Sequence, residues 1–261
     1  MSLRTLRSTL TVGTLLLATF PLAAQNSQPS SKATADISTL VKCNMTTATN
    51  NDGTALLPGS CTDLYSGATV ATKNQWIPIM SKPLKLSNSQ SVFVSPSLVS
   101  GLYTRTRTKT QTGSTSTASA MGAVYLRVVL TPASGGADIV AAPLSSCSGA
   151  VLGCQEVNGD WGVILDSRIQ TLTQEISTCV VDGGGSCTFT SIIDLVLNTS
   201  SANTFNFIFP NVGQGTYTLK VYAAVGSDAT VVGSGSAVGA AAFGLGSVTA
   251  EVVRLVHDFS F

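Results

Sequence analysis

A run of alternating cations and threonines is the most regular chemical pattern in this chain. In GLYTRTRTKTQT, residues 101–112, single threonines separate Arg105, Arg107 and Lys109. Alternate residues of a strand share one face and lie about 6.6 Å apart, close to the spacing of anionic groups along a polymer. With Tyr103 on the same face, the four side chains form a candidate ligand-binding stripe for an acidic polysaccharide. The same charges also suit the solvated face of an edge strand, which cations protect from pairing with other molecules, and this second interpretation needs no ligand.

Residues for nucleophilic catalysis are scarce. His257 is the single histidine, and Asp258 follows it directly. Adjacent side chains of a strand point to opposite faces, so this acid cannot orient the imidazole as in a catalytic triad. The chain also lacks the GxSxG motif of serine hydrolases. We therefore predict no catalytic residue and no enzyme activity of this type.

Paired carboxylates are the other candidate for chemistry. A glycosidase needs one protonated and one ionised carboxyl group on either side of the sugar bond, and Trp161 beside Asp160 would suit sugar stacking. A carboxylate-dependent polysaccharide hydrolase therefore stays open as the alternative function. The 13 acidic residues are scattered, however, which is typical of solvated loops and edges. The candidates are Glu156, Asp160, Asp166, Glu175 and Asp194.

Metal and cofactor sites are not predicted. EVNGD, residues 156–160, alternates oxygen ligands, but Trp161 stands where a calcium loop has glycine and no glutamate closes the loop. No two cysteines have the CxxC spacing of zinc sites. VVGSGSAVGAAAFGLG contains GxGxxxG and not the dinucleotide fingerprint GxGxxG. Since that segment is diluted by glycine and serine, we expect a strand pair with glycine turns there and not a membrane helix.

The N-terminal residues predict export. Arg4 and Arg7 precede an apolar run over residues 10–20 and the small residues of PLAAQ, the pattern of a signal peptide spanning residues 1–24. The run is about half of the roughly 20 residues that span a bilayer, so we expect a secreted, periplasmic or cell-surface protein without an integral membrane span. Without this segment the chain has 12 Lys and Arg against 13 Asp and Glu. This balance excludes a typical nucleic-acid binder, which carries a basic excess.

Six cysteines fall into three close pairs. An even number of cysteines in an oxidising compartment predicts disulfides, although six allow 15 connectivities. Each pair brackets turn-rich chain, so we predict sequential pairing: Cys43 with Cys61, Cys147 with Cys154, and Cys179 with Cys187.

Composition and alternation predict an all-β fold. The chain is 44% hydrophobic and 10% charged, with many β-branched residues. In GAVYLRVVLTP and GTYTLKVYAAV the apolar residues alternate with polar ones, as antiparallel sheets with one buried face require. TFNFIF places Phe205, Phe207 and Phe209 on one face. Further strands are predicted at residues 91–94, 98–110, 162–165, 168–176 and 247–259, whereas TSIIDLVLNTS, residues 190–200, fits either a strand or a short helix.

The expected architecture is an antiparallel β-sandwich, immunoglobulin-like or jelly-roll-like, over residues 74–261. Residues 25–73 are rich in Thr, Ser, Asn and Gly, and they predict an irregular N-terminal region tied down by the first disulfide.

The order of motifs resembles a loosely defined group of secreted bacterial and archaeal proteins. The resemblance covers about residues 77–256 and rests on VSPSLVSGLYTRTRTKTQ, GAVYLRVVL, DSRIQTL, ANTFNFIFPNVGQGTY and GSVTAEVVRLV. PNVGQGTYTLKV is also similar to strand pairs of immunoglobulin-like modules. Both resemblances imply a β-sandwich, and neither implies an activity.

These observations favour a non-catalytic binding or structural module. Its partner would be an extracellular glycan, a protein or a further copy of the chain. The hydrolase remains the first alternative. An outer-membrane β-barrel is the second, because VRLVHDFSF ends in phenylalanine, although 6% aromatic residues is few for the aromatic girdles of a barrel.

Overall fold

The computed structural model describes residues 33–52, 58–149, 152–181 and 185–253. The predicted signal peptide and the pair His257 and Asp258 lie outside these residues. The described chain is almost entirely β-structure, with one short α-helix, α1 (Cys61–Leu64), and one 3-10 helix, η1 (Leu144–Ser146). None of the helices in this part of the chain has the length and apolar character needed to cross a membrane.

Two large sheets pack face to face, which confirms the predicted all-β sandwich. The first, sheet A, has the order β12-β5-β15-β2-β3, with β1 also on β15 and β13 also on β5. It comprises β1 (Ala33–Ser38), β2 (Lys42–Asn50), β3 (Thr69–Val70), β5 (Gln90–Gln111), β12 (Thr190–Thr204), β13 (Phe207–Val212) and β15 (Gly235–Val253).

The second, sheet B, has the order β4-β14-β6-β9-β8, with β7 on β6. It comprises β4 (Ile77–Leu86), β6 (Ser114–Pro132), β7 (Ile139–Val140), β8 (Cys154–Val157), β9 (Asp160–Ile176) and β14 (Gly215–Val232). A separate two-stranded ribbon, β10 (Cys179–Val181) with β11 (Gly185–Cys187), connects β9 to β12.

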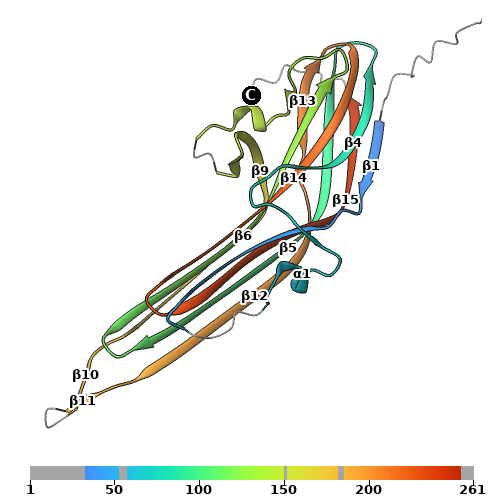
Figure 1. The fold of residues 1–261 in the computed structure, drawn as a ribbon. Helices are drawn as coiled ribbons and strands as arrows, with labels where there is room; N and C mark the ends of the chain where they lie inside the picture. Colours follow the sequence, from blue (N-terminus) through green and yellow to red (C-terminus); the bar gives the residue numbers. More distant parts are fainter. Residues whose placement is uncertain (1–32, 53–57, 150–151, 182–184, 254–261) are drawn as a thin grey trace, which may run out of the picture.

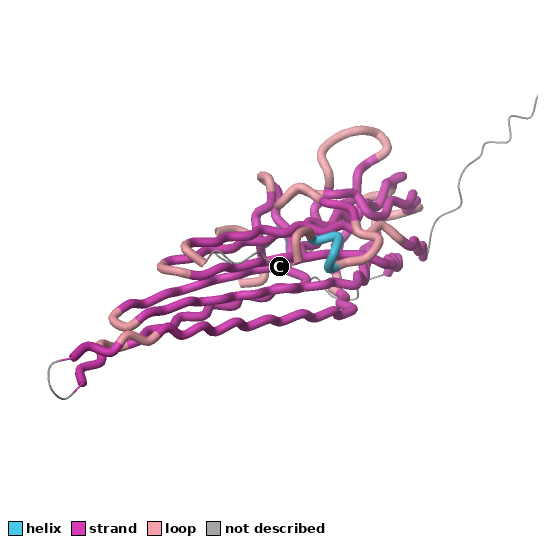
Figure 2. The backbone as a smooth tube through the Cα atoms, turned by 60° about the horizontal axis from the view of Figure 1, so that its bottom comes forward, coloured by secondary structure: helices cyan, strands magenta, loops and turns pink. Residues whose placement is uncertain are grey.

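The molecule is elongated (Figure 1). The buried side chains differ between its two ends. We call the arm the part built on residues 103–111 of β5 and 114–122 of β6, with the strand segments that lie alongside them and the β10–β11 ribbon at its end; the rest is the head. The long strands run the length of both parts (Figure 2), so the head and the arm share the same two sheets.

The head has a conventional apolar core. The alternating residues predicted to face inward on β6 and β14 are buried there, as are Phe207 and Phe209 of β13, while Phe205 is partly buried at its edge. Burying such side chains contributes about 1.5–3 kcal/mol each. The fully buried large side chains include Leu84, Leu86, Leu98, Leu126, Leu130, Leu219 and Phe243.

The arm has a core of small and polar side chains. Thr104, Thr106 and Thr108 of β5 are fully buried. They face Gln170 and Gln174 of β9, which are also buried. The Thr104 hydroxyl donates to Gln170 Oε1 at 2.7 Å, Gln170 Nε2 donates to the Thr106 hydroxyl at 2.6 Å, and the Thr108 hydroxyl donates to Gln174 Oε1 at 2.9 Å. The polar groups inside the arm are therefore paired across the two sheets.

Close approach of the sheets explains the glycines of the arm. A Cβ on Gly239 of β15 would collide with the Met121 carbonyl of β6, and one on Gly122 would collide with the Ala240 carbonyl. Glycine lets the backbones come this near. Apart from the glutamines of β9, the buried side chains between its sheets are small, so the arm is thin.

Two predictions about strand position were wrong in part. β5 is not an edge strand, because β12 pairs with one side of it and β15 with the other. The predicted irregular region, residues 25–73, contributes β1 and β2, which both pair with β15. β15 lies far from β1 and β2 in the sequence, so local composition did not indicate this pairing.

Other strands are longer than predicted. The segments at 91–94 and 98–110 form the single strand β5, those at 162–165 and 168–176 form β9, and residues 190–200 are the strand β12 and not a helix. The glycine-rich stretch contains the expected turn at Gly233, whose φ of 82° favours glycine, between β14 and β15.

The disulfide predictions are confirmed for two pairs. Cys43 bonds Cys61 across 18 residues and Cys147 bonds Cys154 across 7. Cys179 lies opposite Cys187 in the β10–β11 ladder, and Cys187 is disulfide-bonded. The side chain of Cys179 lies outside the described part, so its bond stays a prediction.

We expect Gln170→Met to destabilise the protein by about 2–3 kcal/mol. Methionine has a similar length, but it leaves the Thr104 and Thr106 hydroxyls without their amide partner. Urea unfolding measures the change. Ile169→Met, on the adjacent exposed position of β9, is the control and should change stability by less than about 0.5 kcal/mol. Equal losses in the two variants would contradict a stabilising polar layer.

Candidate functional site: the outer edge of the arm

The predicted cationic stripe lies on the outer face of β5. Thr104, Thr106 and Thr108 point inward, so Tyr103, Arg105, Arg107 and Lys109 share the opposite face, as the alternation predicts. Tyr103 is 6% exposed and packs with Val238 and Ala240 of β15. It therefore contributes to packing and has little surface to offer a ligand.

Carboxylates engage both arginines of the stripe. Arg105 forms a bidentate pair with Asp194 of β12, with Nε 3.0 Å from Oδ1 and Nη2 2.5 Å from Oδ2. Arg107 Nε lies 3.2 Å from Oδ2 of Asp52, whose side chain is 1% exposed, and its Nη1 lies 3.7 Å from Oδ2 of Asp194. The hydrogen bonds from Arg105 lower the pKa of Asp194 below its usual value of 3.8. Two of the three predicted cations are thus neutralised within the protein.

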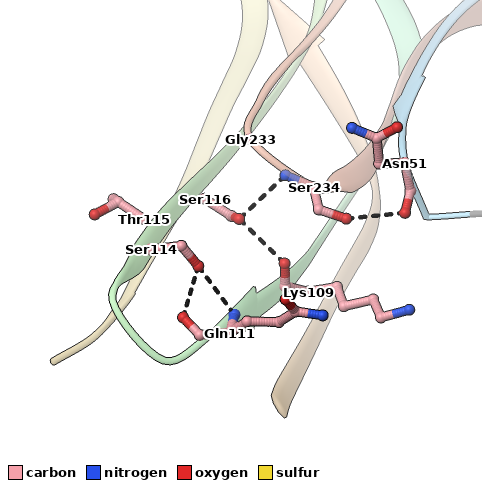
Figure 3. Close-up of a pocket in the computed structure, with 8 residues that line it drawn as sticks. All are labelled: Asn51, Lys109, Gln111, Ser114, Thr115, Ser116, Gly233 and Ser234. Carbon is pink, nitrogen blue, oxygen red and sulfur yellow. Dashed lines mark hydrogen bonds between the residues drawn. The ribbon is translucent and has the colours of Figure 1, made fainter. Parts of the chain in front are cut away.

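Lys109 lies at a polar hollow near the tip of the arm (Figure 3), which is also lined by Asn51, Gln111, Ser114, Thr115, Ser116, Gly233 and Ser234. The serine hydroxyls join the turns that meet there. Ser114 Oγ donates to the Gln111 carbonyl at 2.6 Å, and Ser116 Oγ donates to the Lys109 carbonyl at 3.1 Å. Ser234 donates through its backbone N–H to Ser116 Oγ at 3.1 Å and through its own Oγ to the Asn51 carbonyl at 3.0 Å. This hollow is therefore a structural junction whose serine hydroxyls already form hydrogen bonds within the protein.

The structure gives three of the five candidate carboxylates separate partners. Asp160 pairs with Arg127 at 2.8 Å, and Arg127 Nη1 also donates to the Trp161 carbonyl at 3.1 Å. Asp166 accepts hydrogen bonds from Ser100, Ser201 and Asn203 at 2.5, 3.0 and 3.3 Å.

Asp194 binds Arg105. The other two carboxylates, Glu156 of β8 and Glu175 of β9, are exposed. Within the described ranges, no three His, Cys, Asp or Glu side chains converge on a possible metal position.

The edge strand β12 is the feature that sequence reasoning missed. β12 pairs with β5 along all 15 of its residues without a bulge, and within the described chain it has no strand on its other side. Its sequence, TSIIDLVLNTSSANT, contains no proline, glycine, lysine or arginine. Proline, lysine, arginine and bulges are usual devices that protect an edge from pairing, and β12 has none of these; its one charged residue, Asp194, is paired with Arg105.

The apolar side chains of β12 are exposed on both faces. Ile193, Leu195 and Leu197 lie on the inner face beside the threonines of β5, and each is 42% exposed. Ile192 and Val196 lie on the outer face and are 50% and 49% exposed. The run of apolar residues in the sequence was the available signal, but its helical spacing obscured the strand.

Contacts from both faces hold β12 in place. Gln170 Nε2, which reaches the interior threonines, also donates to the Leu195 carbonyl at 2.9 Å. Arg168 Nη2 donates to the Thr199 hydroxyl at 2.8 Å. On the outer face Asp194 is bound by Arg105. The edge is therefore ordered before any partner binds, which lowers the entropic cost of binding.

No protein-family model and no curated protein sequence matches the chain. Among solved structures, the chain is similar to one from "Structure of infectious bursal disease virus Gx strain", with 12% identity, a TM-score of 0.23, and coverage of 87% of this chain and 43% of that chain. A chain from the Gt strain of the same virus gives 9% identity, a TM-score of 0.13 and the same coverage. The chain thus spans less than half the length of these viral chains. TM-scores this low do not indicate a shared fold, so neither similarity bears on function.

The Arg105–Asp194 pair predicts a pH-dependent contribution to stability. Because the folded state lowers the pKa of Asp194, its ionised form stabilises the fold above the usual value of 3.8, and this stabilisation is lost as the pH falls through the lowered pKa. Asp194→Asn should cost up to about 1 kcal/mol at neutral pH, and the difference from wild type should shrink in acid. Urea unfolding across pH tests this, with Glu175→Gln on the exposed face of β9 as control. A cost of Asp194→Asn that is constant with pH would contradict the assignment.

Proposed function

We propose that the protein is a non-catalytic binding or structural module that acts outside the cytoplasm and binds an extended β-strand along the outer edge of β12. The observation that carries the proposal is the unprotected edge of β12, which is 15 residues long and has exposed apolar side chains over residues 192–197. An exposed edge strand offers a row of backbone donors and acceptors, and addition of a partner strand satisfies them.

The chemistry of the edge defines the partner. Main-chain hydrogen bonds supply affinity in strand addition, and alternate side chains supply specificity. The sole charged residue of β12 is Asp194, which already binds Arg105, so the partner strand needs no cation. Apolar residues on both faces of β12 favour a partner strand that is apolar on both faces and carries little charge.

Two further observations support this proposal. Disulfides such as Cys43–Cys61 and Cys147–Cys154 are typical of oxidising compartments outside the cytoplasm, which agrees with the expected signal peptide. The interactions of Asp160, Asp166 and Asp194 with separate partners favour a non-catalytic role over the hydrolase alternative, because a glycosidase requires two carboxyl groups that act on one bond.

A strand-forming peptide tests the proposal. A short capped peptide of threonine and isoleucine, ordered so that isoleucine lies on both faces of the strand, with lysines at its ends and a fluorescent label, should bind the protein saturably. Leu195→Lys should weaken binding at least about tenfold, because a charge at the centre of the edge opposes strand addition. Fluorescence anisotropy measures the affinity, and hydrogen exchange should show protection along β12.

Two controls make the result specific. Ile169→Lys introduces the same charge at an exposed position of β9, in the other sheet, and should leave binding unchanged. A peptide with a central proline lacks a backbone donor and should bind more weakly. Equal affinity for the proline peptide, or no binding of either peptide, would refute strand addition at β12.

A further inference from the structure

The central part of β12 is complementary to a reversed copy of itself. Consider two copies of β12 that pair antiparallel and are related by a two-fold axis perpendicular to the sheet. The residue numbers of any two opposed residues then add up to the same value, and that value defines the register. Opposed side chains lie on the same face of the sheet. Inner residues therefore lie opposite inner residues. One residue of β12 must then lie opposite its own copy, and the axis passes between the two copies of that residue.

With the axis at Leu195, the apolar residues of the inner face lie opposite one another. Ile193 then lies opposite Leu197 of the second copy, Leu195 lies opposite Leu195, and Leu197 lies opposite Ile193. These inner-face residues are each 42% exposed in the single chain. Pairing would bring them into three consecutive apolar contacts and bury part of their exposed surface. On the outer face, Val196 lies opposite Asp194 and Ile192 lies opposite Asn198.

Other registers are less favourable. An axis at Asp194 puts two carboxylates directly opposite each other, and like charges in this position destabilise a sheet. An axis at Val196 places Ile193 opposite Thr199, and an axis at Ile193 places Leu195 opposite Ser191, so apolar residues face polar ones. The Leu195 register keeps like charges apart and places all three inner-face apolar residues opposite one another. Its apolar-to-polar pairs, Val196 with Asp194 and Ile192 with Asn198, lie on the outer face.

Charge is balanced in the Leu195 register. Each Asp194 keeps its own bidentate Arg105, at 3.0 and 2.5 Å, and its own Arg107 at 3.7 Å. The two carboxylates sit diagonally across the interface, each beside a guanidinium of its own chain. A second copy therefore brings no uncompensated charge to the edge, whereas a strand rich in lysine or arginine would meet these guanidinium groups.

We propose that two copies of this chain pair edge to edge along β12, antiparallel, with the two-fold axis at Leu195, so that their sheets A become one continuous sheet. This inference rests on the proposed strand addition and names its partner. β12 lies at the margin of the arm (Figure 1), so the heads are carried away from the contact on opposite sides. An interface of one strand pair is small, so the association is weak and concentration-dependent.

Sedimentation equilibrium of the purified protein tests the association. The average mass should rise from monomer toward dimer between about 5 and about 200 µM, the range suited to a small interface. Leu195→Lys should remain monomeric, while Ile169→Lys should associate as wild type. Circular dichroism and the melting temperature verify that both variants are folded.

Cysteine cross-linking tests the register independently. No cysteine among the described residues is free, so an introduced thiol reports on the contact. Leu195→Cys lies on the axis and should form a disulfide-linked dimer under mild oxidation. Ile193→Cys and Leu197→Cys should cross-link when mixed with each other and not alone. Ile192 is at least as exposed as Leu195 but lies opposite Asn198, so Ile192→Cys should form no disulfide-linked dimer.

The outcomes separate this inference from the proposed function. A protein that stays monomeric throughout and does not cross-link at Leu195→Cys overturns the two-copy inference; if the threonine–isoleucine peptide still binds, the edge accepts a strand of another protein. Absence of both dimer and peptide binding refutes both proposals. A dimer that cross-links at Ile192→Cys and not at Leu195→Cys overturns the axis.

Discussion

The hydrogen bonds between the threonine face of β5 and the buried glutamines of β9 are the interaction on which the arm depends. They join the two sheets through Gln170 and Gln174, and a buried polar group without its partner costs about 1–3 kcal/mol. A shift of β5 by one residue would turn its threonines outward and bring Arg105 inside. This polar layer therefore fixes which face of β5 is buried and how closely the sheets approach.

The small side chains inside the arm explain why the apolar residues of β12 are exposed. The head buries phenylalanines and leucines between its sheets, whereas the arm buries alanine, threonine and glutamine. The close sheets leave no large apolar core in which β12 could bury Ile193, Leu195 and Leu197, and these side chains remain partly exposed. Gln170, which pairs with the threonines, also donates a hydrogen bond to the Leu195 carbonyl. The polar interior therefore holds β12 in place although it does not bury the apolar side chains of this strand.

The cationic stripe and the apolar edge are parts of one arrangement. Arg105 and Arg107 stand outside because the threonines between them face inward, and from there both reach Asp194. Their positive charge offsets the single charge on β12. The edge is thus both apolar and electrostatically balanced, which is the combination that favours pairing with another uncharged strand.

The sequence by itself determined the features that depend on neighbouring residues. Alternation identified the buried faces of β6 and β14, the separation of threonines from cations on β5, and the all-β class, and close spacing indicated the pairs Cys43–Cys61 and Cys147–Cys154. Only the tertiary structure decided that β5 is central, that β1 and β2 join the sandwich, and that β12 is an edge. Periodicity reports which side of a strand is buried but carries no information about which distant segment lies beside it. Asp194 meets Arg105 across 89 residues, and the character of β12 as a binding edge arises from that long-range pairing.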